Sequence, residues 1–413
     1  MEYNIVFFLI LFFVVVEFCM QQMLSFLNRR AASPVLPDKL IDLYDKTKYA
    51  EQQQYFSVNN KLGSISSIVD FVVIILFLVF GWFGGLYDWA YQVTSGSLIW
   101  NTLLFFGLLF MGNTLLSLPF DIYDTFVIEE RFGFNKTTPF LFVADQLKSL
   151  FFGLFIGGLL LTVILFLYQW LGSLFWLAGC AVVVLFMILL NMFYSQWIVP
   201  LFNKQTPLPE GELRSAIERF ADHAGFCLDN IYVIDGSKRS TKANAYFSGL
   251  GSKKRIVLFD TLIDELTTEE IVAVLAHETG HYKHKHTLQM LLLSVVNVFL
   301  IFFLFSWTVG NVAFAEALGG KGSSFALSLV AFSLLYSPLG LITGLFINAL
   351  SRKNEYQADA FAAKYNLTEA LISGLKKISV RSLSNLTPHP LYVKVYYSHP
   401  TLLQRIGRLM NKA

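Results

Sequence analysis

Seven long runs of the chain contain almost no charged residues, and they limit the possible fold more than any other feature. They lie at about residues 4–27, 66–87, 98–120, 147–169, 173–197, 287–310 and 324–349. Each run is long enough to cross the hydrocarbon core of a bilayer as a helix, which takes about 20 residues. The chain of 413 residues is 55% hydrophobic and 15% charged, which leaves too few charged side chains to cover a soluble surface. The sequence therefore predicts a mainly α, multi-pass membrane protein with seven transmembrane helices.

Lysine and arginine are distributed unevenly among the segments that join these runs. Of the 31, only Lys321 falls on one side of the predicted membrane, and all the others lie at 29–61, 131–148, 204–285 and 352–412. Because cytoplasmic loops carry the excess of basic residues, the N-terminus is predicted to lie outside and the C-terminus in the cytoplasm. The net charge is only +2, and the basic residues follow the topology rather than forming one patch, so no nucleic-acid partner is expected.

A short motif, H-E-x-x-H, lies in a polar stretch just before the sixth run. The stretch begins with Thr267 and Glu270 in a capping-box pattern, which predicts the start of a helix. On a helix, residues four apart share one face, so His277 and His281 can bind one Zn²⁺. Glu278 is turned about a quarter of a circle away and is predicted to act as a general base. A chance match on a surface helix is the alternative.

A second cluster of charged residues follows the last run. The sixth run is predicted to cross the membrane outward and the seventh to cross it back. Glu355 is therefore predicted to lie on the same side of the membrane as His277 and His281. Catalytic zinc commonly takes a third protein ligand, which Glu355 can supply. Asp359 lies four residues later, on the same helical face, and can accept a hydrogen bond from the outer N–H of a ligating histidine. The alternative is a solvated charge cluster that ends the last transmembrane helix.

The largest polar segment, 201–286, has a pattern of its own. Two β-type runs, 231–234 and 255–259, are bounded by turn residues, which predicts a small α/β insert. His284 and His286 follow the motif, but their spacing from His281 does not repeat the interval of four, so they are predicted to lie at the membrane interface. The expected organisation has four parts. These are transmembrane helices 1–5 (1–200), a catalytic α/β segment (201–286), transmembrane helices 6–7 (287–350) and a cytoplasmic C-terminal segment (351–413).

Several motifs together resemble a known family. They are HETGH, SRKNEYQADAFA (351–362), EERFGFNKTT (129–138), PLFNKQTPLP (200–209) and YSHPTLLQR (397–405). In this order, on seven runs, they resemble the type I CAAX prenyl proteases, which are integral-membrane zinc metalloproteases that trim prenylated C-termini. The resemblance implies a barrel of seven transmembrane helices around a water-filled chamber. It also implies one Zn²⁺ near the cytoplasmic end of that chamber.

The same resemblance implies roles for four further residues. His399 would face the substrate carbonyl or stabilise the oxyanion, with Arg405 nearby in support as a substrate-binding residue. Asn244 and Ala245 look like the edge-strand pair with which zinc proteases hold an extended peptide through main-chain hydrogen bonds. From the residues alone, His399 is equally well a surface histidine, and the Asn244–Ala245 pair an ordinary strand.

The predicted activity is that of a zinc endopeptidase that cleaves near the hydrophobic or prenylated C-terminus of a peptide or protein substrate, in contact with membrane lipid. One alternative is a quality-control membrane metalloprotease with no prenyl requirement. Another is a seven-span transporter or receptor with a structural metal, in which Glu278 would have no task. The chain is shorter than eukaryotic family members and has no obvious di-lysine signal. These features favour a bacterial member in the inner membrane, while a eukaryotic member would lie in the endoplasmic reticulum.

Overall fold

The computed structural model describes residues 3–33, 35–37, 40–41, 45–225, 231–248 and 255–411. The long helices are α1 (Ile5–Ala31), α2 (Lys46–Val79), α4 (Leu98–Tyr123), α5 (Pro139–Leu171), α6 (Phe175–Trp197), α11 (His286–Thr308) and α13 (Phe325–Lys364). The shorter helices are α3 (Trp82–Val93), α7 (Val199–Phe202), α8 (Glu212–His223), α9 (Asp260–Glu265), α10 (Thr268–Lys283), α12 (Val312–Glu316), α14 (Thr368–Arg381), α15 (Pro390–Tyr396) and α16 (Leu402–Met410). The strands are β1 (Gln205–Pro207), β2 (Ile231–Ile234), β3 (Ala245–Ser248) and β4 (Arg255–Phe259). The predicted mainly α fold is confirmed.

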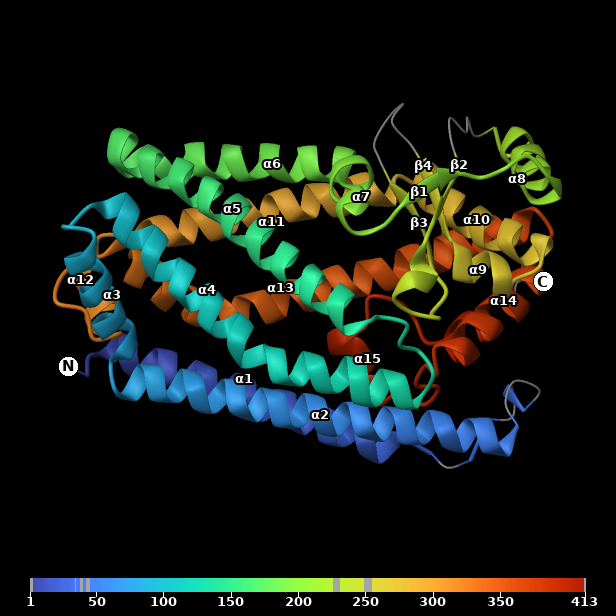
Figure 1. Cartoon of the computed structure of the whole chain (residues 1–413), viewed down its shortest axis with the longest axis horizontal. Coiled ribbons are helices and arrows are strands. Elements are labelled where there is room, and N and C mark those ends of the chain that lie inside the picture. The colour runs from blue at the N-terminus through green and yellow to red at the C-terminus, as the bar shows by residue number, and fades with distance from the viewer. Residues whose placement is uncertain are drawn as a thin grey trace.

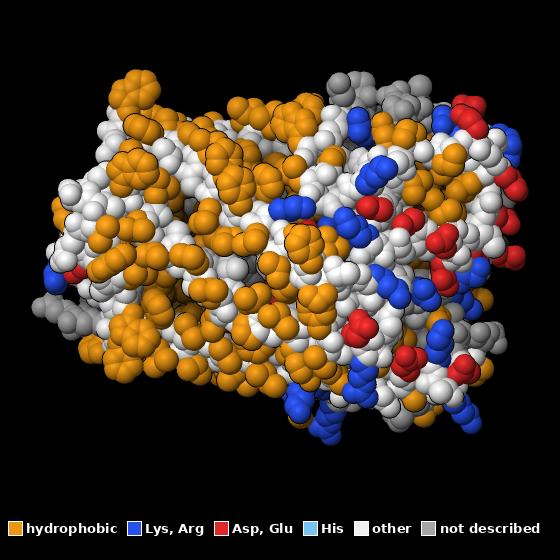
Figure 2. Space-filling model, viewed as in Figure 1, with side chains coloured by type: hydrophobic (Ala, Val, Ile, Leu, Met, Phe, Trp, Pro, Cys, Tyr) orange, Lys and Arg blue, Asp and Glu red, His pale blue; other side chains and the backbone are white. Residues whose placement is uncertain are grey.

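The molecule is elongated, with an apolar half and a polar half. The long helices extend along its length, while the sheet, α8, α10 and α14 gather at the end that holds the C-terminus (Figure 1). Hydrophobic side chains cover the surface of the helical half, and charged side chains gather over the half that holds the sheet (Figure 2). The hydrophobic surface of the helical half is suited to contact with lipid, and the charged surface of the half that holds the sheet is suited to contact with water. The prediction of an integral, multi-pass membrane protein is confirmed.

Within the described residues, six helical stretches are long and apolar enough to cross a membrane. One of them, Pro139–Phe202, has 64 residues and contains both α5 and α6. A short 3₁₀ turn, Gly172–Leu174, joins these two helices, and Gly172 has a φ of 53°. That left-handed conformation suits glycine and lets the chain change direction.

The second predicted run, 66–87, differs most from the observed helices. The helix α2 begins 20 residues earlier, at Lys46, and therefore extends from the apolar half well into the polar half (Figure 1). It ends at Val79 because the chain turns at Gly81, which has a φ of 64°. After this turn, α3 forms a separate helix at the end of the molecule opposite the sheet (Figure 1).

The polar half contains a sheet of strand order β1-β2-β4-β3 among the described residues. The predicted strands 231–234 and 255–259 are β2 and β4, which pair in parallel, and β3 pairs antiparallel with β4 at the edge. Ile231, Ile256 and Leu258 of the sheet pack with Ile271 and Leu275 of α10. This apolar core fixes α10, which carries the H-E-x-x-H motif, against the sheet.

Two ion pairs connect the sheet region to the long helices. The Arg239 guanidinium donates to both carboxylate oxygens of Asp145 on α5, at 2.7 and 3.0 Å. The Lys242 ammonium lies 2.8 Å from Glu129 Oε2 and donates to the Tyr55 hydroxyl of α2 at 2.9 Å. Lys242 lies in the chain just before β3, so these contacts hold the edge strand against the helical half.

The predicted helix start at Thr267 is confirmed. The Thr267 hydroxyl accepts from the Glu270 backbone N–H, and the Glu270 carboxylate accepts from the Thr267 N–H, so both halves of the capping box are present. At its other end, α10 packs tightly on α13. A Cβ on Gly280 would lie 2.9 Å from Ala358 Cα and 3.1 Å from the Ala358 carbonyl oxygen. The absence of a side chain at Gly280 therefore brings α10 close to the part of α13 that carries Glu355 and Asp359.

Candidate functional site

Three side chains from two helices converge where α10 meets α13. His277 Nε2 lies 3.2 Å from His281 Nε2, and His281 Nε2 lies 3.2 Å from Glu355 Oε1. His277 Nε2 is 3.5 Å from Glu355 Oε2. The motif predicted the two histidines on one helical face, and the return of α13 brings Glu355 beside them. Their ligand atoms form a group that could hold a metal ion.

The spacing of these atoms fits a tetrahedral metal site. Zinc bonds to nitrogen and oxygen are about 2.0–2.2 Å long, so neighbouring ligand atoms lie about 3.3–3.6 Å apart. The two histidine nitrogens are 3.2 Å apart, and each lies close to one of the two Glu355 oxygens, His281 Nε2 at 3.2 Å from Oε1 and His277 Nε2 at 3.5 Å from Oε2. In addition, Glu355 Oε2 is buried and accepts no hydrogen bond among the described residues, although His277 Nε2 and the Arg405 guanidinium both lie 3.5 Å from it. A closer cation would satisfy this oxygen, so the residues present fit a bound metal.

A charged pair supports the His277 ring. Asp359 Oδ1 lies 2.8 Å from His277 Nδ1, as the sequence predicted. Arg405 donates to both carboxylate oxygens of Asp359, at 3.0 and 2.6 Å. Burial and the Arg405 charge favour the neutral ring, but the Asp359 and Glu355 carboxylates outweigh them and raise the pKa of His277 to about 9. The surroundings of this ring therefore attract positive charge, whether it is a proton or a metal ion.

A neutral chain supports the His281 ring. His286 Nδ1 lies 3.1 Å from His281 Nδ1, and His286 Nε2 lies 2.9 Å from Gln357 Oε1. A position of His286 at the membrane interface stays a prediction, but its side chain packs inside the protein, where the residue is 4% exposed. The reason is a break in the helix: Lys285 has a φ of 57°, which ends α10 and turns His286 back onto His281. His284 is exposed.

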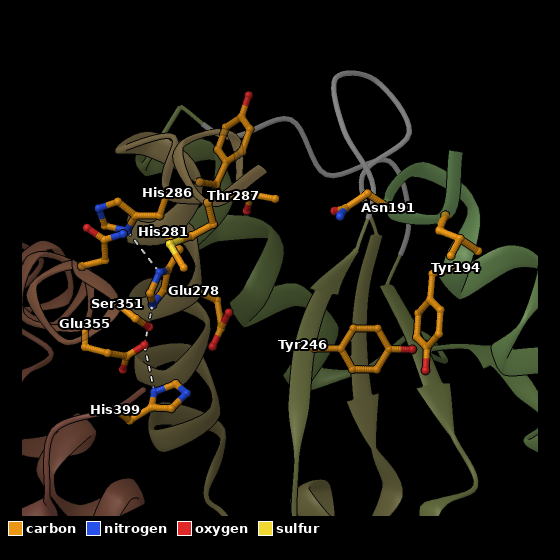
Figure 3. A pocket seen from close by; sticks show the side chains of 14 residues that line it. Asn191, Tyr194, Tyr246, Glu278, His281, His286, Thr287, Ser351, Glu355 and His399 are labelled. Atoms are coloured by element: carbon orange, nitrogen blue, oxygen red, sulfur yellow. Dashed lines mark hydrogen bonds and ion pairs between the residues drawn. The ribbon is translucent and has the colours of Figure 1, made fainter. Parts of the chain in front are cut away.

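A cavity of about 550 Å³ opens beside the cluster. Glu278, His281, Glu355 and His399 lie along one side of it, and Tyr246 and Tyr194 lie on the other (Figure 3). The Glu278 carboxylate points into this space, away from the partners of Glu355 (Figure 3). Glu278 is therefore placed to meet a molecule in the cavity rather than to complete the cluster of ligand atoms.

His399 lines the cavity. Its Nδ1 is 2.9 Å from Glu355 Oε1, and its side chain is 65% exposed. Arg405 has a different position from the one expected for a substrate contact. It is 11% exposed, paired with Asp359 and 3.5 Å from Glu355 Oε2, so it lies behind the cluster. The physical reason is that its guanidinium neutralises a buried carboxylate, which would be costly to leave unpaired.

The predicted peptide-binding pair lies at the start of the edge strand. Ala245 is the first residue of β3, and its N–H donates to Asn244 Oδ1 at 2.8 Å. The Asn244 carbonyl accepts from the Phe259 N–H at 3.1 Å. Tyr246, the next residue, lines the cavity. No sequence pattern pointed to Tyr246 or to Tyr194 of α6, because the sheet and a transmembrane helix meet there over a separation of about 50 positions.

Known proteins match this chain over nearly its whole length. Residues 25–204 match the family described as CAAX prenyl protease N-terminal, five membrane helices, and residues 207–413 match peptidase family M48. The chain is 34% identical to CAAX prenyl protease 1 of Saccharomyces cerevisiae, over 96% of this chain and 93% of the relative. It is 35% identical to the human CAAX prenyl protease 1 homolog, over 75% of this chain and 74% of the relative. The crystal structure of S. mikatae Ste24p matches with a TM-score of 0.92 at 35% identity, covering 98% of this chain and 99% of that chain.

The fold and the site together define a multi-pass membrane metalloprotease, an enzyme that acts on peptide or protein substrates. The chain belongs to the CAAX prenyl protease 1 family within peptidase family M48. The resemblance drawn from the motifs is thereby confirmed, and the transporter or receptor alternative is set aside.

Proposed function

We propose that this protein is a zinc endopeptidase that cleaves near the prenylated or hydrophobic C-terminus of its substrates. The observation that carries the proposal is the convergence of His277, His281 and Glu355 beside a cavity into which Glu278 points. The names of the relatives, CAAX prenyl protease 1, support the class of substrate.

In this proposal His277, His281 and Glu355 hold one Zn²⁺ per chain. Zinc bound there would supply a Lewis acid that lowers the pKa of water to about 7 and polarises the scissile carbonyl. Glu278 takes a proton from the attacking water and delivers it to the leaving amine. Asp359 fixes the orientation of His277 through Nδ1, and Arg405 balances the charge of Asp359. The division of labour follows from which groups reach the cavity and which lie behind it.

His399 is proposed to stabilise the oxyanion. Its Nδ1 interacts with Glu355 Oε1, which leaves Nε2 for a partner in the cavity. A donor at that point would act on the charge that develops on the carbonyl oxygen. Asn244 and Ala245 at the start of β3 are proposed to align an extended peptide through main-chain hydrogen bonds, since an edge strand offers free backbone groups.

The membrane arrangement is proposed to comprise seven spans, with α5 and α6 counted separately. The sole basic residue predicted outside, Lys321, pairs with Asp88 at 3.2 Å, near α3 and α12 and away from the sheet. We place the N-terminus outside and the segments 201–286 and 351–413 in the cytoplasm, with the helices 1–200 and 287–350 in the membrane. That membrane is the bacterial inner membrane, or the endoplasmic reticulum in a eukaryote.

A chamber between the helices is proposed to hold the hydrophobic end of the substrate. A second cavity, of about 470 Å³, lies among apolar side chains and glycines of α4 and α5, and hollows are visible between side chains of the apolar half (Figure 2). Leu103, Phe106 and Leu161 are among its lining residues. Apolar walls of this kind favour a lipid chain over a charged peptide.

The test compares kcat/KM for a farnesylated CAAX peptide with that for the same peptide without the lipid, in detergent. The proposal expects the farnesylated peptide to be cleaved faster. A ratio at or below one would contradict the prenyl-binding part and leave a membrane metalloprotease with no prenyl requirement.

A further inference from the structure

The histidine that follows the motif, His286, makes a contact that the proposed reaction does not use. The His281 ring presents Nε2 to Glu355 Oε1 at 3.2 Å. Its other nitrogen, Nδ1, lies 3.1 Å from His286 Nδ1. His286 in turn places Nε2 at 2.9 Å from Gln357 Oε1. The three side chains therefore form a hydrogen-bonded chain that begins at the proposed metal ligand (Figure 3 shows its first contact).

The proton positions along this chain follow from its two ends. If His281 gives the Nε2 lone pair to a metal, the neutral ring carries its proton on Nδ1. His286 Nδ1 must then accept, so the proton of the neutral His286 ring lies on Nε2. That N–H donates to Gln357 Oε1, which can only accept. This arrangement gives each contact one donor and one acceptor, and it leaves His281 Nε2 free to bind a metal.

We propose that His286 is a positioning residue that fixes the tautomer and orientation of His281 for metal binding, with Gln357 fixing the tautomer of His286. The proposal rests on the proposed metal site and adds a partner for its second histidine. Groups that hold a ligating histidine by its outer nitrogen typically change metal affinity about 10–100-fold when they are lost. His286 is buried whereas Gln357 is exposed, so the larger effect is expected at His286.

The geometry also provides a variant that separates hydrogen bonding from packing. The Oδ1 atom of an asparagine occupies nearly the place of Nδ1 in a histidine, so His286→Asn keeps an acceptor for His281. His286→Leu fills similar space but accepts no hydrogen bond. His284 stacks on His286, with ring centroids 5.5 Å apart, and is exposed. His284→Leu is therefore the matched control.

The experiment measures Zn²⁺ affinity of the purified full chain in detergent, by competition with a chromogenic chelator. His286→Leu should bind Zn²⁺ about 10–100-fold more weakly than the unaltered protein, and Gln357→Leu should show a smaller loss. His286→Asn and His284→Leu should keep Zn²⁺ affinity close to that of the unaltered protein. In the Co²⁺-loaded protein, the visible absorption bands should shift in His286→Leu and remain in place in His286→Asn.

Zn²⁺ affinity unchanged in His286→Leu would overturn the proposal, and so would an equal loss in the Asn and Leu variants, which would indicate a packing role. If His286→Leu does not fold, Gln357→Leu decides, because its side chain is exposed and an unchanged affinity there overturns the chain of donors. A protein that binds no Zn²⁺ in unaltered form would overturn the proposed metal site as well. Normal Zn²⁺ binding with no effect of His286→Leu would overturn this inference alone.

Discussion

The two histidines of the cluster serve the same proposed metal but are supported in different ways. His277 has a buried carboxylate and guanidinium behind it, Asp359 and Arg405. His281 has the neutral pair His286 and Gln357. The side chain of His277 is 7% exposed and that of His281 is 23% exposed and lines the cavity. The charged support thus lies where protein encloses it, and the neutral support lies where substrate and water arrive.

This difference has an energetic meaning. A buried carboxylate strengthens the basicity of its histidine, but it needs a paired cation to offset its desolvation. Arg405 supplies that cation to Asp359. A neutral chain needs no counter-charge and so can lie near the cavity. The charged support of His277 should therefore matter for both stability and metal binding, whereas the neutral support of His281 should matter mainly for metal binding.

The largest effect on stability and Zn²⁺ affinity is expected when the charged support of His277 loses one of its two members. Asp359→Leu removes the carboxylate that accepts two hydrogen bonds from the buried Arg405 guanidinium, with Glu355 Oε2 at 3.5 Å as its remaining carboxylate partner. Breaking a buried pair in this way typically costs about 3–5 kcal/mol of folding free energy. Zn²⁺ affinity should also fall by about 10–100-fold. Thermal unfolding in detergent and chelator competition measure the two quantities.

The double variant Asp359→Leu with Arg405→Met sharpens the comparison. Replacing both charges with apolar side chains should restore most of the stability but not the Zn²⁺ affinity, because His277 still lacks an acceptor. Recovery of Zn²⁺ affinity together with stability would show that Asp359 and Arg405 affect metal binding through folding alone.

A smaller effect is expected when both histidines are moved away from Glu355. Gly280→Ala would place a Cβ 2.9 Å from Ala358 Cα, so α10 and α13 would have to move apart. Overpacking of this kind costs about 1–3 kcal/mol, and Zn²⁺ affinity should fall because the two histidines move away from Glu355. Gly63→Ala is the matched control, since a Cβ there meets nothing within 4 Å. Equal behaviour of the two variants would show that the close approach of α10 and α13 is not needed.

The smallest effect is expected at the far end of α10, away from the cluster. Glu270 Oε1 accepts from the Ser373 hydroxyl at 2.6 Å, and its Oε2 accepts from the Lys377 ammonium at 2.8 Å. Burial acts to raise the pKa of Glu270, but the hydrogen bonds from Lys377, Ser373 and Thr267 outweigh it and lower that pKa below its ordinary value. A lowered pKa stabilises the folded state above the unfolded pKa of about 4.3 and loses this effect as the pH falls below it.

Glu270→Gln should therefore lower the free energy of unfolding at pH 7 by about 1–2 kcal/mol, which is seen as a lower unfolding midpoint. The difference between variant and parent should shrink as the pH falls toward about 4. Zn²⁺ affinity at neutral pH should change little, in contrast to the Asp359 variant. A difference in stability that stays constant over this pH range would show that the charge of Glu270 does not contribute.

The sequence predicted the site best where local geometry determines it. The capping box at Thr267 and the spacing of His277 and His281 follow from helix periodicity, and the return of two membrane helices was enough to place Glu355 near them. The contact of His286 with His281 was not predicted, because the left-handed conformation of Lys285 breaks the helical periodicity on which the prediction depended. The position of Arg405 behind the cluster was not predicted either, since the sequence shows no reason for α16 to pack behind α13.

The membrane half shows the same limit. Runs of apolar residues predict which segments are helices, but the break at Gly81 and the polar extension of α2 depend on the contacts that each helix makes. Tyr194 and Tyr246 reach one cavity from a long helix and a strand. The Arg239–Asp145 and Lys242–Glu129 pairs also connect the sheet region to the helical half, and no local sequence pattern predicts these long-range contacts.

The central claim is that Glu278 acts on a substrate beside a metal held by His277, His281 and Glu355. The most direct test measures, in the same preparations of the unaltered protein and Glu278→Gln, both bound Zn²⁺ and kcat for a farnesylated CAAX peptide. The account predicts one Zn²⁺ per chain in both proteins and a fall in kcat of about 10²–10⁴-fold in the variant, because the amide cannot accept a proton. A variant that keeps more than about a tenth of the original kcat, or that loses its Zn²⁺, would contradict the account.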